Sequence, residues 1–181
     1  QATRSHSGVS GLLTDAAVRR PISSPAALDA LVGQEIAVSP WLQIDQERID
    51  CFADATGDRQ WLHVEPERAA RGPFGTTIAH GFLTLSLLPV LLDAAIEFQH
   101  MKMGVNYGLN KVRFTAPVPV GSRIRVRARL LASEPLPELE GTPGRQIVWQ
   151  LTAEREGSTK AVCVAETVSR RHWGNEHVQH A

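Results

Sequence analysis

The pattern of hydrophobic positions predicts one long, largely apolar helix near the middle of the chain. Between Ile78 and Phe98 the polar positions are few, namely His80, Thr84, Ser86, Asp93 and Glu97. A helix that is apolar nearly all round is one that other structure covers on most sides. Pro89 removes a backbone donor from this segment, so we expect a bend or break there. Only Gly81 to Leu92 is free of charge, which is too short for a membrane span of about 20 residues.

Four strands are predicted after this helix. The clearest is Ser122 to Ala132, where Ile124, Val126, Ala128 and Leu130 alternate with four arginines. A period of two over this length indicates a half-buried strand. The others are expected at Gly104 to Thr115, Gln146 to Arg155 and Lys160 to Arg170. The last two form a hairpin around Glu156-Gly157-Ser158, and the Pro- and Glu-rich stretch from Glu134 to Gly144 is expected to be a loop.

The segment before the central helix contains start and stop signals. Ser24 and Pro25 are typical of a helix start, and a short helix is expected to run to Val32. A strand from Gln34 to Ile44 follows, with an edge or a bulge at Pro40. Asp45 then caps a second helix, which Gly57 ends.

Taken together, these elements predict one α+β domain from residue 24 to 170. Successive strands that are close in sequence favour antiparallel pairing, and a sheet that curls around the long helix would cover its apolar surface. Residues 1–23 are polar and are expected to form a mostly disordered tail. Residues 171–181 show no pattern and are expected to be a C-terminal tail.

Composition narrows the classes of function. The 181 residues include nineteen basic and nineteen acidic side chains, so no overall field attracts nucleic acid or a membrane surface. Cys51 and Cys163 make no disulfide framework, and no secretory signal is evident near the start. We therefore expect a cytoplasmic protein with reduced thiols.

Candidate chemistry lies in the polar loop that precedes the long helix. Asp58 and His63 are five residues apart, which does not place them on one helix face, but Gly57 permits a loop that brings them together. Alone, Asp58 would most often be the acceptor of an Asx-turn, and His63 would more often be structural. An imidazole titrates near neutrality, and a neighbouring carboxylate fixes its tautomer and position. We therefore favour a catalytic pair.

The same residues carry a family resemblance. Gly57-Asp58, Leu62-His63 and Ile78-Ala79-His80-Gly81 resemble the hydratase motif of the MaoC-like (R)-specific enoyl-CoA hydratases, and the resemblance extends from Gly33 to Arg170. It implies the hot-dog fold, a curled antiparallel sheet wrapped around one long central helix. It also implies reversible syn addition of water to trans-2-enoyl-CoA, with one water held between Asp58 and His63.

Further site residues follow from this resemblance. The N–H of Gly81, at the start of the helix, would bind the thioester oxygen as it gains negative charge, although Gly81 would equally permit close packing. Gln60 and Trp61 stand where the family usually has Asn and Pro, so Trp61 is expected either to line the acyl channel or to brace the loop. Gln60, Ser86, Asn106 and Lys111 are weaker candidates for substrate binding. His80 is taken as structural or as a polar residue at the helix end.

The remaining expectations concern ligands and partners. The four arginines of the alternating strand would suit coenzyme A phosphates, but such a row is more often a solvated face, which we prefer. The histidines lack metal-ligand spacing, so no metal is predicted, and no cofactor is expected because coenzyme A is part of the substrate. The partners expected are acyl-CoA or acyl-ACP and a second copy in a homodimer. A hot-dog thioesterase and a non-catalytic acyl-CoA-binding subunit remain as alternatives.

Overall fold

The main sheet is built from four long antiparallel strands, and the computed structural model describes residues 18–174 of the chain. These strands are β5 (Met101–Phe114), β6 (Arg123–Leu139), β7 (Thr142–Arg155) and β8 (Ala161–Trp173). The sheet order is β2-β6-β7-β8-β5, where β2 (Glu35–Val38) and β3 (Leu42–Gln43) both pair with β6. The predicted alternation is confirmed, since the apolar side chains from Ile124 to Leu130 are at most 1% exposed.

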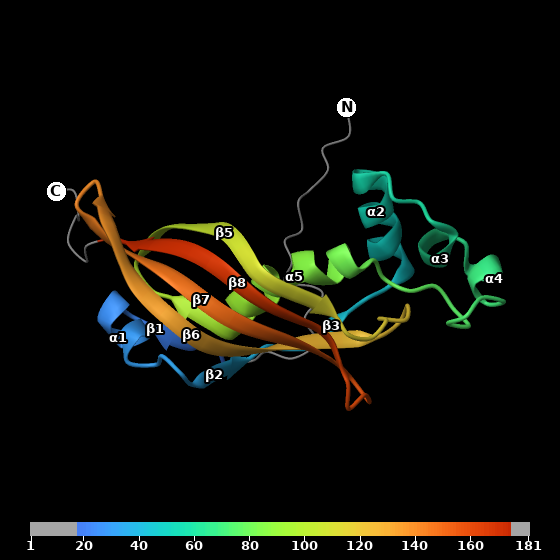
Figure 1. Cartoon of the computed structure of the whole chain (residues 1–181), viewed down its shortest axis with the longest axis horizontal. Helices are drawn as coiled ribbons and strands as arrows, with labels where there is room; N and C mark the ends of the chain where they lie inside the picture. The colour runs from blue at the N-terminus through green and yellow to red at the C-terminus, as the bar shows by residue number, and fades with distance from the viewer. Residues whose placement is uncertain (1–17, 175–181) are drawn as a thin grey trace.

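Helix α5 (Gly81–Ala95) packs against the sheet and forms the centre of the core. Figure 1 shows the long strands curving past it on one side. Its buried side chains pack in one cluster with inward-facing residues of β6, β7 and β8, namely Ile124, Val126, Leu130, Ile147, Trp149, Leu151 and Ala165. The predicted central helix covered by a curled sheet is therefore confirmed.

The boundaries of this helix differ from the prediction. It begins at Gly81, and it passes Pro89 without ending. The last apolar residues of the predicted helix instead form β4 (Ile96–Phe98), which pairs in parallel with β1 (Arg20–Ile22). Residues 20–22, which were placed in the N-terminal tail, are thus part of the domain, and Ile22 is 1% exposed. The tail residues 1–17 lie outside the described residues.

The shorter helices begin at the expected capping residues, but the first of them ends at Asp29 and not at the predicted Val32. In α1 (Pro25–Asp29), the Ser24 hydroxyl accepts a hydrogen bond from the Ala27 N–H. In α2 (Gln46–Thr56), Asp45 caps the start, and Gly57 ends it with a left-handed φ of 78°. The chain then forms α3 (Trp61–Val64) and α4 (Pro66–Ala69). Figure 1 shows α2, α3 and α4 gathered at the end of the molecule where α5 begins.

Two further predictions are corrected at the opposite end of the sheet. The stretch from Glu134 to Gly144 is not a loop, because β6 and β7 remain paired up to a turn at Glu140-Gly141. Prolines are tolerated there because β2 pairs with β6 only around residues 127–129, so the later part of β6 has an unpaired edge. Strand β8 continues to Trp173, beyond the predicted domain end at residue 170. Residues 175–181 lie outside the described part. Within the described residues, no helix is long and apolar enough to cross a membrane.

Candidate active site

The loop that follows α2 presents the carboxylate of Asp58. The N–H of Gly57 donates to the Ala53 carbonyl and closes the helix, so the chain turns sharply just before Asp58. The Asp58 Oδ1 atom accepts a hydrogen bond from the Gln60 N–H at 3.4 Å, which is long for such a bond. The Asx-turn considered from the sequence is therefore present but weak. Asp58 is exposed, so its carboxylate remains available to a ligand or a water.

The imidazole of His63 is held in one tautomer. His63 lies in α3 and is 8% exposed. Its Nδ1 atom is 2.7 Å from the carbonyl oxygen of Ile78. Because a carbonyl can only accept, Nδ1 carries a proton, and in the neutral ring Nε2 then presents a lone pair. A neutral imidazole with an unprotonated Nε2 is able to accept a proton.

His80 connects the Asp58 loop to His63. The rings of His63 and His80 are stacked with centroids 3.7 Å apart. The Nε2 atom of His80 donates to the backbone carbonyl of Asp58 at 2.9 Å, and Phe52 packs against the same ring. His80 was expected to be structural or a polar helix-end residue. The structure places it against both members of the pair, since its ring stacks on His63 and bonds to the Asp58 backbone.

Sequence reasoning missed a second residue that contacts His63, Gln46 at the start of α2. Its amide nitrogen donates to the His63 carbonyl at 2.7 Å, and its amide oxygen accepts from the Thr77 hydroxyl at 2.6 Å. The Ile78 N–H also donates to the Leu62 carbonyl at 3.0 Å. These bonds join three segments that are far apart in the sequence. The residue itself carries no signal, because an N-terminal Gln is common in helices.

Asp58, His63 and His80 together form a compact group of ligand-type atoms. A carboxylate oxygen and one ring nitrogen from each histidine lie within 4.8 Å of one another. Within residues 18–174, no direct hydrogen bond joins the Asp58 carboxylate to the His63 ring, and a single water fits between groups at such a spacing. The same three atoms could coordinate a cation. The absence of a metal therefore stays a prediction.

Gly81 is the first residue of α5, immediately after His80. No side chain caps the start of this helix, so its N–H dipoles are available to an anion or a partial negative charge. A Cβ at Gly81 would lie 2.9 Å from the ring of Phe114 on β5. The packing role considered from the sequence is therefore observed. It does not exclude the role of the N–H as a donor to the thioester oxygen.

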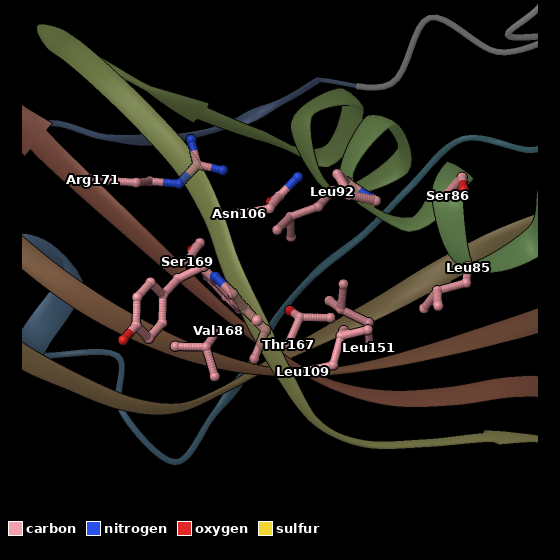
Figure 2. Close-up of a pocket in the computed structure, with 14 residues that line it drawn as sticks. Leu85, Ser86, Leu92, Asn106, Leu109, Leu151, Thr167, Val168, Ser169 and Arg171 are labelled. Atoms are coloured by element: carbon pink, nitrogen blue, oxygen red, sulfur yellow. The ribbon is translucent and has the colours of Figure 1, made fainter. Parts of the chain in front are cut away.

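A cavity of about 430 Å³ lies between α5 and the sheet. It begins at Leu85, four residues beyond Gly81, and it is walled by α5, β5, β7 and β8. Ser86 and Asn106, both predicted as substrate-binding residues, line it, and Figure 2 shows them with Leu85 and Leu109. Gly81 lines a second cavity of about 360 Å³ with Phe114. The structure thus places an acyl-sized space beside the start of α5.

The other predicted residues are placed differently. Trp61 lines neither the 430 Å³ cavity nor the cavity beside Gly81. Its ring instead packs against Gly72, and the guanidinium of Arg68 lies 4.8 Å from its centroid. This position favours the bracing role over the channel role. Gln60 is exposed at the start of α3, and Lys111 is exposed on β5, and neither is among the residues that line the 430 Å³ cavity.

The arginine row of β6 is largely paired with carboxylates. Arg123 contacts Glu156, while Arg125 and Arg127 both contact Glu154. These two arginines lower the pKa of Glu154 through hydrogen bonds, against the effect of burial. Arg127 also contacts Glu35, so three carboxylates pair with three of the four arginines. This supports the interpretation of a solvated face rather than a phosphate site.

An antiparallel sheet curled around one helix, with an Asp–His pair at the start of that helix, defines a hot-dog protein of the hydratase type. The family model for the MaoC like domain matches residues 27–141, so the chain belongs to the MaoC-like family. The 3-hydroxyacyl-thioester dehydratase Z of Mycobacterium tuberculosis is 52% identical over 151 residues, which cover 83% of this chain and 97% of that protein. Nodulation protein N of Rhizobium leguminosarum is 43% identical over 148 residues, covering 81% of this chain and 89% of that protein.

Solved structures show the same fold at lower identity. The MaoC-like dehydratase of Rhodospirillum rubrum superposes with a TM-score of 0.64 at 18% identity, covering 80% of this chain and 94% of that chain. The (R)-hydratase of A. caviae, described as involved in PHA biosynthesis, gives a TM-score of 0.56 at 24% identity, covering 76% of this chain and 94% of that chain. The hot-dog fold implied by the sequence motif is thereby confirmed.

Proposed function

We propose that this protein is a hydro-lyase that adds water reversibly to a trans-2-enoyl thioester and yields the (R)-3-hydroxyacyl thioester. The observation that carries this proposal is the close approach of the Asp58 carboxylate and His63, whose Nδ1 donates to the Ile78 carbonyl and so leaves Nε2 as the lone-pair nitrogen of the neutral ring. The relationship to a 3-hydroxyacyl-thioester dehydratase supports the same chemistry. We take acyl-CoA as the carrier, with acyl-ACP as the alternative.

In this mechanism one water sits between Asp58 and His63. As its oxygen bonds to C3, one of its protons passes to the pair, and a proton from the pair is delivered to C2. Both transfers come from one side of the substrate, so the addition is syn. We assign the acid and base roles jointly, because two coupled groups share their protons. In the reverse direction the pair removes the C2 proton and returns a proton to the departing hydroxyl.

The thioester oxygen gains negative charge as C3 is attacked. We assign the Gly81 N–H as its donor, because it is the first N–H of an uncapped helix and follows the residue that stacks on His63. The acyl chain would then run along α5 into the 430 Å³ cavity beyond Leu85. No cofactor or metal takes part in these steps, and coenzyme A enters only as part of the substrate.

A direct assay separates this proposal from the two alternatives. Purified protein is mixed with crotonyl-CoA and with a longer enoyl-CoA, and the loss of enoyl absorbance is followed together with the release of thiol. Absorbance loss without thiol release, with the (R)-alcohol as product, is expected. Thiol release would indicate a thioesterase, and binding without either change would indicate a non-catalytic subunit.

We further propose that the protein acts as a homodimer in the cytoplasm. Strand β5 ends the sheet, and it exposes a row of apolar side chains, namely Met101, Met103, Val105, Tyr107 and Leu109. A long, apolar edge strand is an association surface. Because β5 also walls the cavity, pairing there would close it.

Light scattering should give twice 19.8 kDa for the parent chain. The variant Val105→Lys should shift it toward the monomer, and a lone monomer of the parent at micromolar concentration would contradict the dimer.

A further inference from the structure

The cavity between α5 and the sheet changes character along its length. Leu85, near the start of α5, belongs to an apolar end, whereas Ser169 and Arg171 of β8 belong to a polar end, and Figure 2 shows these two groups toward opposite ends of the pocket. The polar end lies beside the last turns of α5, where Arg171 contacts Asp93. Asp93 is twelve residues beyond Gly81, which corresponds to about 18 Å along the helix. The polar end is therefore remote from the reacting carbons.

Three side-chain atoms around this cavity are buried without a hydrogen-bond partner. They are Nε1 of Trp149, Oγ of Ser169 and Nε of Arg171, and no acceptor for them exists among the described residues. The indole and guanidinium nitrogens can only donate, and the hydroxyl can donate as well. Buried donors are normally paired, so a cluster of unpaired ones requires an explanation. An acceptor oxygen on a ligand would satisfy them.

The arrangement of strands explains why these donors converge. Ser169 lies opposite Asn106 of β5, and Arg171 lies opposite Gly104. Residues two apart on a strand share a face, so Ser169 and Arg171 point to the same side of the sheet. A Cβ at Gly104 would lie 3.2 Å from Nη1 of Arg171. The absence of a side chain at Gly104 therefore leaves room for the guanidinium.

The guanidinium of Arg171 is held in place from its other sides. Its Nη2 contacts Asp93 at 3.2 Å, and its Nη1 contacts the sulfur of Met101 at 3.0 Å. The Cζ atom of the guanidinium lies 4.1 Å from the centroid of the Phe98 ring. The side chain of Arg171 is 9% exposed and that of Asp93 is 57% exposed, so the negative member of the pair is hydrated while the positive member is buried. Burial lowers the pKa of Arg171, although Asp93 opposes that effect.

We propose that this polar end binds an acceptor oxygen at the distal end of the acyl chain. The inference rests on the proposed function and adds the substrate class: an acyl thioester whose chain ends in a carboxylate or carbonyl group. Asn106, Ser169 and Arg171 supply the donors, and the apolar wall from Leu85 to Leu92 receives the hydrocarbon between the two ends. A purely alkyl chain of the same length would reach these donors without satisfying them.

The test uses saturated thioesters, which cannot be hydrated, so that binding is measured apart from catalysis. Decanoyl-CoA is compared by isothermal titration calorimetry with two analogues, one bearing a terminal carboxylate and one a carbonyl group near the chain end. We expect at least one oxygenated analogue to bind about tenfold more tightly, which is about 1.4 kcal/mol. The two analogues distinguish a charged from a neutral acceptor. Equal or weaker binding of both analogues relative to decanoyl-CoA would overturn the inference.

Variants at the polar end test which side chains cause the tighter binding of an oxygenated analogue over decanoyl-CoA. Ser169→Ala and Arg171→Met should each reduce it, and Ser169→Ala remains informative if loss of Arg171 disturbs folding. Arg170→Met is the matched control, because Arg170 is on the same strand but stacks on Tyr107 at 3.5 Å, and it should retain the preference. A preference unchanged in both test variants would contradict the inference. Binding of none of the three thioesters would overturn the inference together with the proposed function, whereas preferred binding without hydration in the enoyl assay would contradict the proposed function alone.

Discussion

The imidazole rings of His63 and His80 are stacked 3.7 Å apart, and the two rings hold different parts of the site. His63 donates from Nδ1 to the Ile78 carbonyl, while His80 donates from Nε2 to the Asp58 carbonyl. The stack therefore joins the loop that carries the carboxylate to the short helix that carries the base. His80 touches neither water nor substrate in the proposed mechanism, and its effect on the reaction is exerted through position.

Replacing His80 should therefore lower turnover more than substrate affinity. In His80→Ala the Asp58 carbonyl loses its donor and the His63 ring loses its support, and a misplacement of this kind can cost about a hundredfold in rate. His80→Gln retains an amide donor and should recover part of that loss. Steady-state kinetics on one enoyl-CoA, with kcat and KM reported separately, provide the measurement. Equal kcat in the parent and in both variants would exclude the positioning role.

Two variants of Gly81 distinguish the contribution of its N–H to turnover from the contribution of its missing side chain to packing. Gly81→Ala and Gly81→Pro both add a Cβ that meets Phe114, but only the Pro variant removes the N–H. Proline is tolerated at the first position of a helix, so α5 should persist. Loss of one such donor in other enzymes lowers turnover by about 10²–10³-fold. We expect a drop of that order in kcat for Gly81→Pro relative to Gly81→Ala, and similar values in the two variants would assign Gly81 to packing alone.

Trp61 braces the loop in the structure, so its replacement should affect all substrates alike. Its ring packs against Gly72 and beneath Arg68, away from the described cavities. Trp61→Ala should lower the melting temperature and reduce turnover on C4, C8 and C12 enoyl-CoA by a common factor. Trp61→Pro, which restores the usual family residue, should leave the ratio of turnover between the three chain lengths equal to that of the parent. A shift in that ratio would restore the channel role considered from the sequence.

The buried thiol of Cys163 should make the stability of the fold depend on pH. Cys51 is exposed and Cys163 is buried, and burial raises the pKa of Cys163 to about 11 from its ordinary 9.0. The folded state thus holds the Cys163 proton more tightly than the unfolded state. This stabilisation is complete below pH 9 and is lost as the pH rises from 9 through 11, by about 2.7 kcal/mol at most, at 1.36 kcal/mol per pKa unit. Denaturant unfolding at pH 8, 9, 10 and 11 should show a smaller decline in Cys163→Ala than in the parent chain. Parallel declines would contradict the assignment.

Local signals in the sequence predicted many elements correctly. Ser24, Asp45 and Gly57 mark helix ends through side-chain and backbone chemistry that acts within a few residues. The alternation around Ile124 and Val126 predicted β6 because one face of a strand is buried. The Asp58–His63 pair was proposed from two residues that are five apart in the sequence, and its catalytic role stays a prediction.

Long-range relationships could not be predicted from such signals. Ile96–Phe98 continues the apolar run of α5, and only its parallel pairing with Arg20–Ile22 makes it a strand. The bonds from Gln46 to His63 and Thr77 depend on how α2 packs, and no local pattern records them. Arg171 was placed in a tail because the residues from 171 onward show no apolar pattern, yet its guanidinium reaches a cavity that only the complete sheet creates.

The central claim is that Asp58 and His63 act as one catalytic unit. The most direct test is the hydration rate of an enoyl-CoA by Asp58→Asn, His63→Ala and the double variant, with circular dichroism to show that each is folded. Each single variant should retain less than about a tenth of the parent turnover, a barrier increase above roughly 1.4 kcal/mol. The double variant should be little slower than either single one, because residues that act together are not additive. A folded single variant with more than a tenth of the parent turnover would contradict the claim.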